Sequence, residues 1–257
     1  MLEIYQELIK ITTRGERAVL ATIISSQGST PRKAGAKMLF KEDGSFVGTV
    51  GGGGTEQKIR KKVAEVMKTG KSQIVRFDLS GKDEALEMLC GGQMEVFLEP
   101  IMPTESVYLF GAGHTSQSTA AIANMLGFQV IVIDPRPEYN NRDRFPAADS
   151  LIVEDYDSAF AKLSVDEDSY IVIYTSGHTV DEQCLLFAVG TGAKYIGMIG
   201  SKKKSKEVKE HLLEKGISQQ QLDRVHSPIG VDIDAETPEE IAISILAELV
   251  KVRRSLD

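Results

Sequence analysis

Residues 107–116 read VYLFGAGHTS, and this stretch decides the fold of the second half of the chain. The apolar run at 107–110 is typical of a buried strand, and Gly111 and Gly113 follow it directly. The first glycine permits a tight turn, and the second lets an anion approach the backbone where the next helix begins. The third position of the glycine pattern is Ser116, which weakens the match to a dinucleotide-binding loop.

The chain beyond this turn alternates short apolar strands with helices. We expect strands near residues 107–110, 128–133, 151–153, 170–174 and 195–199, and helices after Gly113, at about 181–189 and at about 202–215. Thr237-Pro238-Glu239-Glu240 is a capping box with proline at the first helical position, so it predicts the start of a last helix. The alternation predicts an α/β fold, with a Rossmann-like parallel sheet over residues 106–257 covered by helices on both faces.

An acid stands where a ribose-binding carboxylate is expected in such a fold. Asp134 ends the second predicted strand, 23 residues after Gly111, and Arg136 follows it. We therefore expect a nucleotide or another phosphate-bearing ligand in the crevice beside the glycine turn. Two alternatives stay open: the turn could bind nothing, and Arg136 could face solvent instead of a phosphate.

The first hundred residues follow a different pattern, which predicts a small α+β domain. We expect a helix at the N-terminus, strands at 18–25, 37–40, 45–50, 72–79 and 94–99, and a charged helix at about 56–68. Asp43-Gly44 predicts a hairpin turn, and Gly70 predicts the end of the helix. Pro100 and Pro103 bracket a join that we expect to be a stiff linker, not a continuing strand. The expected division is a first domain at 1–100, a linker at 101–105 and a second domain at 106–257.

Two loops of the first domain and one cysteine motif are candidate sites. Residues 25–35 read SSQGSTPRKAG, a loop of hydroxyls, an amide and cations that could hold an anion or a heterocycle, or could be a solvated turn. Four glycines at 51–54 are costly to order, which favours close backbone approach of a ligand, with Glu56 as its polar contact; a flexible hinge is the alternative. Cys90 precedes two glycines and could be an approachable thiol or a buried structural cysteine.

The second domain carries further candidates after its predicted strands. His178 and Asp181 could serve acid–base chemistry or contact a ligand, although Asp181 could equally be only a helix N-cap. The lysines at 202–204 open a helix, where they could bind a phosphate or form a solvated basic face. Cys184 lies in an apolar helical run, and we expect it in the core.

Composition excludes several classes of protein. The 257 residues are 42% hydrophobic and 26% charged, as in ordinary globular proteins. No apolar run reaches the roughly 20 residues that a membrane span needs, and acids stand at the N-terminus where a signal peptide carries bases. Two cysteines rule out a disulfide scaffold, so we expect a reducing, cytoplasmic setting. No Cys/His cluster has the spacing of metal ligands, so no dedicated metal site is expected.

The charge is divided unevenly along the chain. Residues 1–105 carry a net charge of +1 and residues 106–257 a net charge of −8, which together make the −7 of the whole chain. This balance argues against broad nucleic-acid binding, because such binding depends on attraction to phosphates.

Taken in order, these motifs resemble the XdhC/CoxI family of xanthine dehydrogenase accessory proteins. The resemblance rests on residues 25–32, 51–56, 90–100, 111–114, 134–136, 195–201 and 228–240, so it spans nearly the whole chain. It implies an N-terminal domain and a C-terminal Rossmann-like domain. Besides Ser116, two positions depart from the family pattern: Ser176 stands where many members have a histidine, and Asp234 replaces a usual glycine.

The resemblance implies a maturation factor for a molybdenum hydroxylase such as xanthine dehydrogenase. Family members are thought to hold molybdenum cofactor, a phosphorylated pterin with a dithiolene, to support its sulfuration by a cysteine desulfurase, and to deliver it to the apoenzyme. The expected role is therefore that of a cofactor chaperone rather than a free-standing catalyst, and a homodimer stays open. No nucleic-acid or membrane partner is expected.

The family motifs mark candidate cofactor contacts on this sequence. From the resemblance these are Gln27, Gly28, Arg32, Gly52, Gly53, Glu56, Gly111, Gly113, His114, Asp134 and Arg136, to which the chemistry of the loops adds Lys33 and His178. Cys90 matches the family's Cys-Gly-Gly motif and is a candidate sulfur or metal contact.

Two other functions stay open. One is an NAD(P)-dependent oxidoreductase, with His178 as the acid–base group and the first domain as a substrate lid. The other is a nucleotide-sensing scaffold whose Rossmann-like half reports on a metabolite. Ser116 at the third glycine position and the lack of an apparent lysine–tyrosine catalytic pair disfavour the oxidoreductase.

Overall fold

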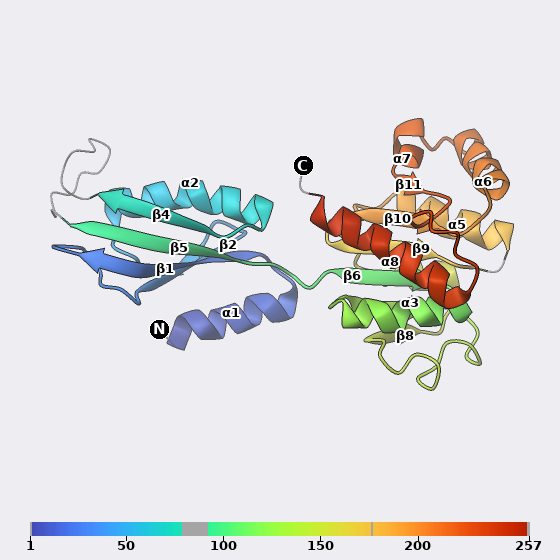
Figure 1. Ribbon diagram of the computed structural model, residues 1–257, viewed down its shortest axis with the longest axis horizontal. Coiled ribbons are helices and arrows are strands. Elements are labelled where there is room, and N and C mark those ends of the chain that lie inside the picture. Colours follow the sequence, from blue (N-terminus) through green and yellow to red (C-terminus); the bar gives the residue numbers. More distant parts are fainter. Residues whose placement is uncertain (1, 79–91, 176, 256–257) are drawn as a thin grey trace. The chain divides into compact units, whose positions relative to one another are not determined.

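The computed structural model describes residues 2–78, 92–175 and 177–255. The chain divides into two compact units, Met1–Pro103 and Thr104–Asp257, called here unit 1 and unit 2 (Figure 1). Each unit has its own sheet and its own hydrophobic core, so each is described by itself.

Unit 1 is built on an antiparallel sheet with the strand order β3-β2-β1-β5-β4. Its strands are β1 (Ala18–Gln27), β2 (Lys37–Lys41), β3 (Phe46–Gly48), β4 (Gln73–Asp78) and β5 (Gln93–Ile101), and its helices are α1 (Leu2–Arg14) and α2 (Gly53–Thr69). The hairpin expected at Asp43-Gly44 joins β2 to β3, and Gly70 ends α2 in the left-handed conformation, as predicted. The small α+β domain inferred from the sequence is thereby confirmed.

The two helices of unit 1 cover opposite faces of this sheet. Val19, Ala21 and Ile23 of β1 pack with Ile59 and Val63 of α2 in one cluster. On the other face, Ala18 and Leu20 pack with Ile4 and Ile11 of α1. Because side chains alternate along a strand, the near-continuous apolar run at the start of β1 supplies both cores at once.

A β-bulge divides β1 into two parts. The pairing with β5 shifts between Ile23, which pairs with Val96, and Ser25, which pairs with Glu95. Ile24 is the extra residue, and 46% of it is exposed. Since a bulge changes which residues share a face, Ser25 lies on the face opposite Ile23 instead of the same face.

The join at the prolines differs from the prediction. Pro100 does not begin a linker, because β5 continues through it and pairs Pro100 with Val19 of β1. The pairing of β5 with β4 begins at Leu98, so Pro100 lies where β5 has a neighbour on one side only. A proline is tolerated there because its missing N–H is not needed on the open side.

Unit 2 is a parallel sheet with the strand order β11-β10-β9-β6-β7-β8. Its strands are β6 (Ser106–Phe110), β7 (Gln129–Ile133), β8 (Ser150–Ile152), β9 (Ser169–Ile173), β10 (Tyr195–Met198) and β11 (Val225–His226). Numbered within the unit and read from β8, this is the order 3-2-1-4-5-6 of a Rossmann fold. The predicted parallel-sheet domain is confirmed.

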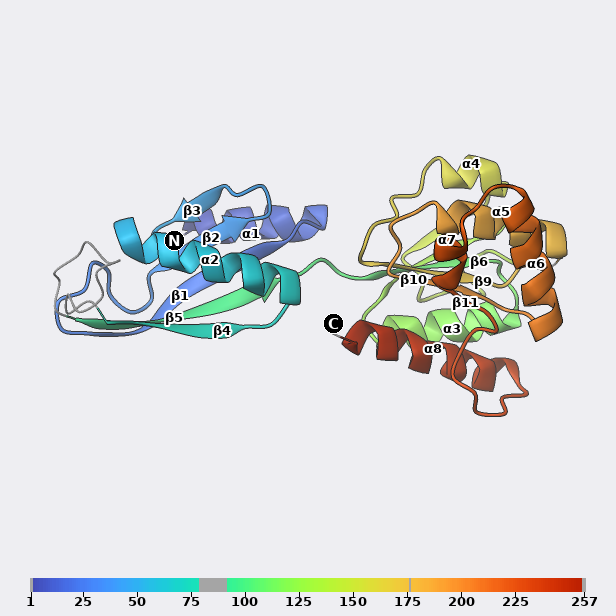
Figure 2. The ribbon, with the colours of Figure 1, turned by 90° about the horizontal axis from the view of Figure 1, so that it is seen from above.

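Helices cover both faces of the sheet of unit 2 (Figure 2). One face holds α3 (His114–Met125) and α8 (Pro238–Arg254), and the other holds α4 (Tyr156–Phe160), α5 (His178–Val189), α6 (Lys202–Glu214) and α7 (Gln219–Asp223). Thr237 caps α8 in a reciprocal capping box with Glu240, as predicted. Cys184 of α5 is fully buried, which confirms its place in the core.

Candidate functional site

The glycine turn of unit 2 lies where the sheet reverses its strand order. β6 is flanked by β7 on one side and β9 on the other, so the loops after β6 and β9 leave the sheet side by side. Gly111 has φ of 106°, and a Cβ there would lie 2.9 Å from the carbonyl oxygen of Tyr174. Only glycine therefore fits at this turn.

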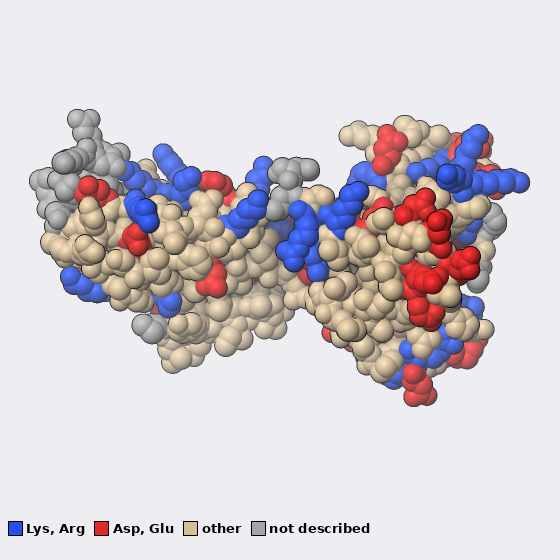
Figure 3. All heavy atoms as spheres, viewed as in Figure 1, with Lys and Arg blue, Asp and Glu red and all other residues tan. Residues whose placement is uncertain are grey.

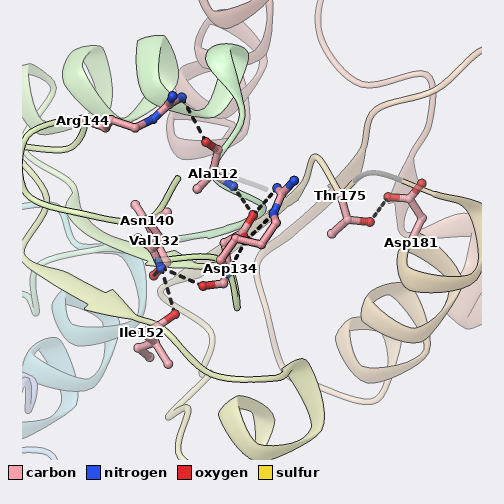
Figure 4. Close-up of polar contacts among 9 residues, drawn as sticks. Ala112, Val132, Asp134, Asn140, Arg144, Ile152, Thr175 and Asp181 are labelled. Carbon is pink, nitrogen blue, oxygen red and sulfur yellow. Dashed lines mark hydrogen bonds and ion pairs between the residues drawn. The ribbon is translucent and has the colours of Figure 1, made fainter. Parts of the chain in front are cut away.

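Asp134 holds the glycine turn in place (Figure 4). Its side chain is 1% exposed, and its Oδ2 accepts a hydrogen bond from the backbone N–H of Ala112 at 2.8 Å. The guanidinium of Arg136 donates from Nε to Oδ1 at 2.9 Å and from Nη2 to Oδ2 at 2.7 Å, and the N–H of Arg136 donates to Oδ1 at 3.0 Å. Each carboxylate oxygen thus accepts two hydrogen bonds from the protein itself.

Electrostatics keeps Asp134 ionised in this buried position. Burial alone would raise the pKa of the carboxyl, but the Arg136 guanidinium and the N–H groups of Arg136 and Ala112 outweigh it and lower the pKa below its ordinary value. The carboxylate in turn raises the pKa of Arg136. A ribose hydroxyl would have to compete with these four donors, so in this arrangement Asp134 positions the turn.

Two residues outside the predicted motifs complete the support of this turn. The amide of Asn140 donates to the carbonyl oxygens of Val132 at 3.3 Å and Ile152 at 2.9 Å, and so ties the segment after β7 to β7 and β8. Arg144 donates from Nη2 to the carbonyl oxygen of Ala112 at 3.3 Å. Polar residues are frequent at 134–144, directly after a buried strand. This pattern could have identified Asn140 and Arg144 as residues of the site.

The N-terminus of α3 is open beside the turn. Gly113 is the N-cap residue, no described side chain caps the helix there, and a Cβ at Gly113 would meet no described atom within 4 Å. His114 begins the helix and is exposed, whereas the hydroxyl of Ser116 is buried with no described partner. Free backbone N–H groups and the helix dipole make this place suitable for an anion such as a phosphate.

A second polar cluster follows β9 and β10. Asp181 of α5 is fully buried; its Oδ1 accepts a hydrogen bond from the hydroxyl of Thr175 at 2.5 Å, and its Oδ2 pairs with the ammonium of Lys204. Figure 4 shows Thr175 and Asp181 facing each other at the start of α5. His178 begins α5, but its side chain lies outside the described residues. Lys204 is thus an internal ion-pair partner rather than part of a solvated basic face.

Two glycines of unit 1, Gly92 and Gly51, lie against the loop of residues 25–35. A Cβ at Gly92 would lie 2.6 Å from the carbonyl oxygen of Gln27 and closer still to that of Ser29. A Cβ at Gly51, whose φ is 141°, would lie 3.1 Å from the side chain of Pro31. Gly92 and Gly51 therefore both pack on the loop of residues 25–35. Cys90 and Gly91 lie outside the described residues.

The side chains of these motifs have definite partners. Glu56 accepts hydrogen bonds at Oε1 from the hydroxyl of Thr49 at 2.6 Å and from the N–H of Gly52 at 2.9 Å, so it braces the start of α2, where Gly53 is the first residue. Gly28 has φ of 70°, and its carbonyl oxygen accepts from Lys33 Nζ at 3.5 Å. Arg32 is exposed.

Gln27 lines a cavity beside the bulge in β1. The bulge turns Ser25 and Gln27 onto the face of Glu95, and these three residues line a cavity of about 340 Å³ together with Arg76 and Gln93. Arg76 donates from Nε to Glu95 Oε1 at 2.7 Å. The cavity thus presents amide, hydroxyl and charged groups, which suit a polar heterocycle.

Metal-ligand clusters and membrane-spanning helices are absent from the described part of the chain. In the ranges 2–78, 92–175 and 177–255, no three His, Cys, Asp or Glu side chains form a group that could hold a metal ion. None of the described helices combines the length and the apolar character needed to cross a membrane.

The fold and its loops define a two-domain protein in which a small antiparallel α+β domain precedes a Rossmann domain. The chain belongs to the XdhC and CoxI family: residues 107–249 match the family model described as the XdhC Rossmann domain, and residues 11–78 match the model of the XdhC and CoxI family.

Relatives and a solved structure agree with this membership. The chain is 34% identical to the uncharacterized protein YqeB of Escherichia coli, over 99% of this chain but only 47% of that protein, so it spans about half of its length. It is 25% identical to a probable xanthine dehydrogenase component of Bacillus subtilis, over 93% of this chain and 94% of that one. It is 24% identical to the molybdenum cofactor insertion chaperone PaoD of Escherichia coli, over 93% and 84%.

The solved structure described as a xanthine dehydrogenase from Bacillus halodurans is similar over 98% of this chain and 96% of that chain, with a TM-score of 0.54 and 27% identity. The likeness extends over both units.

Proposed function

We propose that this chain binds molybdenum cofactor as its cargo, supports the sulfuration of that cofactor by a cysteine desulfurase, and delivers it to a xanthine dehydrogenase-type molybdenum hydroxylase in the cytoplasm. Family membership and the similarity to a molybdenum cofactor insertion chaperone support the general role. The proposed binding, sulfuration and delivery of the cofactor are argued from individual residues of each unit.

The observation that carries the proposal is the packing of Gly92 on the backbone of Gln27 and Ser29. This packing holds Gly92, the last residue of the Cys-Gly-Gly sequence, against the amide-bearing loop. A pterin needs hydrogen-bond donors and acceptors, and the dithiolene end of the cofactor needs a soft, sheltered environment. The first loop supplies amide and hydroxyl groups, and Cys90, two residues before Gly92, would supply the thiol.

The groups of unit 2 suit the phosphate of such a cargo. The open N-terminus of α3 at Gly113 offers free N–H groups, and His114 lies exposed beside them. When bound, the cofactor would supply the molybdenum and the dithiolene sulfurs; the chain would hold and shelter it. In unit 1 the proposed residues for a pterin are Gln27, Gly28, Arg32 and Lys33. In unit 2, taken by itself, the proposed residues for a phosphate are Gly111, Gly113, His114 and His178.

A nucleotide-binding role for unit 2 is the second candidate, because the strand order and the glycine turn are those of dinucleotide-binding folds. It is the weaker candidate for NAD(P). The carboxylate expected to bind the ribose, Asp134, already accepts hydrogen bonds from Ala112 and Arg136.

The experiment is to purify the full chain from a molybdate-supplied host and to measure molybdenum by mass spectrometry and pterin by fluorescence after oxidation. We expect molybdenum and pterin in equal, near-stoichiometric amounts. The preparation is then mixed with apohydroxylase, whose activity should rise. Stoichiometric nicotinamide without pterin would contradict the proposal and favour the oxidoreductase.

Single-residue variants test cofactor binding and sulfur transfer separately. Gln27→Ala should lower the bound molybdenum severalfold, whereas Gln220→Ala, an exposed glutamine of α7, should not change it. Cys90→Ser should retain the cofactor but abolish the gain in hydroxylase activity that depends on the desulfurase. If Cys90→Ser activates the hydroxylase as well as the unaltered chain does, the sulfur role is wrong and the carrier role stands.

A further inference from the structure

A groove crosses unit 2 beside the loop that joins β11 to α8. It consists of two adjoining cavities of about 430 Å³ and about 340 Å³, which share Lys202 and Pro228 in their walls. Both lie at the carboxyl ends of parallel strands, because Lys202 follows β10 and Pro228 follows β11. The glycine turn after β6 lies at the same edge of the sheet.

The larger cavity combines apolar side chains with carboxylates. Ile229 and Ile241 line it, as do Val231 and Ile233, which are 38% and 49% exposed. Asp232 and Asp234 alternate with these apolar residues and are also exposed. A protein surface that exposes branched apolar side chains next to charges of one sign is typical of an interaction site.

The wall of this cavity is held firmly. The hydroxyl of Ser244 in α8 donates to the carbonyl oxygen of Val231 at 2.6 Å, and the N–H of Val231 donates back to the carbonyl oxygen of Ser244 at 3.2 Å. The N–H of Gly230 donates to Glu248 Oε2 at 2.8 Å. A loop fixed in this way loses little conformational freedom when a partner binds.

Asp234 has an unusual backbone conformation, with φ of 53°. Aspartate tolerates the left-handed region better than most residues, but glycine would be less strained there. A carboxylate is therefore present at a position where the backbone would favour glycine, and such local strain is often found at functional sites.

Negative charge is concentrated around the larger cavity. Residues 225–250 contain six acids, with no lysine or arginine among them. Glu240, Glu248 and Glu239 accept hydrogen bonds within the chain, from Thr237, Tyr195 and Ser118 respectively. Asp232 and Asp234 line the cavity, and Glu236 is exposed. Figure 3 shows carboxylates gathered on this face of unit 2, over the start of α8.

The smaller cavity has the opposite charge. Lys202, Lys206 and Lys209 of α6 line it against one acid, Glu210, which pairs with Lys206 at 3.7 Å, and Leu213 is an apolar contact. Lys206 and Lys202 are exposed. The groove is therefore polar along its length, acidic and apolar at one end and basic at the other.

We propose that this groove is the docking site for the client hydroxylase, which inserts an extended segment with a branched or aromatic apolar residue beside lysine or arginine. The basic part of the segment pairs with Asp232 and Asp234, and an acidic part lies over the α6 lysines. This inference rests on the proposed function. A client is the partner that fits best because the groove shares its sheet edge with the open N-terminus of α3, where a phosphorylated cargo would be handed over.

The test is the affinity of the full chain for purified apohydroxylase, measured by biolayer interferometry at two salt concentrations. The variant is Asp232→Asn with Asp234→Asn, since asparagine also tolerates the left-handed conformation. The matched control is Glu138→Gln with Glu214→Gln, two exposed acids of unit 2 outside the groove with the same change of charge. We expect the groove variant to bind about tenfold more weakly, mainly through slower association, and the control to stay within about twofold.

Two further variants test the other contacts. Ile233→Ser, which removes an exposed apolar side chain and leaves the core intact, should speed dissociation several-fold. Lys206→Glu should weaken binding as well, because it reverses the basic end. Molybdenum content should be unchanged in all of these variants.

Four outcomes would overturn the inference. If the groove variants bind apohydroxylase as the unaltered chain does, the client docks elsewhere and the proposed function still stands. If the groove variants lose molybdenum but keep the client, the groove contributes to cofactor binding instead of client docking. If the groove variants change only the self-association seen by analytical ultracentrifugation, the occupant of the groove is a second copy of the chain. An unaltered chain that carries cofactor yet never binds the client would contradict both proposals.

Discussion

The carboxylate of Asp134 accepts the backbone N–H of Ala112 at 2.8 Å, across 22 residues of sequence. The bond joins the end of β7 to the glycine turn that follows β6. Asp134 stands where a ligand-binding carboxylate is expected, but here it stabilises the loop whose glycines would receive the ligand. Arg136 stabilises this arrangement further, because its guanidinium neutralises the buried carboxylate of Asp134.

Removing that charge should destabilise unit 2. Asp134→Asn keeps the size of the side chain but removes the ion pair with Arg136, so we expect a loss of about 2 kcal/mol in the free energy of unfolding. Thermal unfolding followed by circular dichroism would measure it. Asp143→Asn, at an exposed aspartate of the same unit, should cost less than about 0.5 kcal/mol. Equal melting curves for the two variants would show that Asp134 does not hold the turn.

The buried pair of Asp181 and Lys204 offers a second test. Lys204→Met leaves Asp181 fully buried without its cation, which should cost about 3 kcal/mol. The matched control is Lys203→Met, at the exposed lysine that precedes it in sequence, which should change stability by less than about 0.5 kcal/mol. Urea unfolding of the two variants under the same conditions separates the contributions. A similar loss in both would indicate a general effect of charge.

Gly92 should tolerate no side chain. Gly92→Ala would place a Cβ 2.6 Å or less from the carbonyl oxygens of Gln27 and Ser29, so we expect a loss of about 2 kcal/mol and weaker cofactor binding. Gly192→Ala, where a Cβ would meet the nearest atom at 3.9 Å, serves as the control and should fold normally. If Gly92→Ala retains both stability and bound molybdenum, the packing of the two motifs is not required.

The stability of unit 2 should depend on pH through Glu248. Burial opposes its ionisation, but hydrogen bonds from His226, Tyr195 and the N–H of Gly230 outweigh burial and lower the pKa from 4.5 to about 2. A lowered pKa stabilises the fold above pH 4.5, and this stabilisation is lost as the pH falls from 4.5 towards 2. It amounts to at most about 3 kcal/mol.

Glu248→Gln should therefore lower the melting temperature at pH 7. Its difference in melting temperature from the unaltered chain should shrink progressively below pH 4.5. Melting curves at several pH values, compared with those of Glu138→Gln, would measure the effect. A difference between Glu248→Gln and the unaltered chain that stays constant down to about pH 3 would mean that the carboxylate is not the source of the stabilisation.

Much of the fold could be predicted because its signals are local. Gly111, the capping box at Thr237 and the apolar runs of the strands each favour one conformation through a few neighbouring residues. The short helices α4 and α7 were not predicted, because five residues show no helical period. The capping box of Ser218 and Gln221 was nevertheless a readable signal for α7. The continuation of β5 through Pro100 depends on where β4 stops pairing, which no local pattern reveals.

The candidate site was less predictable, because its roles depend on partners far apart in sequence. Asp134 was singled out as a residue beside the glycine turn, but its bond to Ala112 follows from strand order. Lys204 is one of three consecutive lysines at 202–204, and the sequence does not separate it from the other two. Its ion pair with the buried Asp181 does. That Gln27 contributes to a cavity also depends on the bulge at Ile24.

The extra residue Ile24 separates the two tasks of β1. Before it, the strand contributes to two hydrophobic cores; after it, Ser25 and Gln27 line a polar wall. A related chain that lacks one residue here would keep both tasks, because Ser25 would follow Ile23 directly and still face Glu95 across a regular ladder. An alignment gap of one residue at this position is therefore compatible with an unchanged binding surface, whereas an insertion within the pairs at 18–23 would exchange the side chains of the two cores.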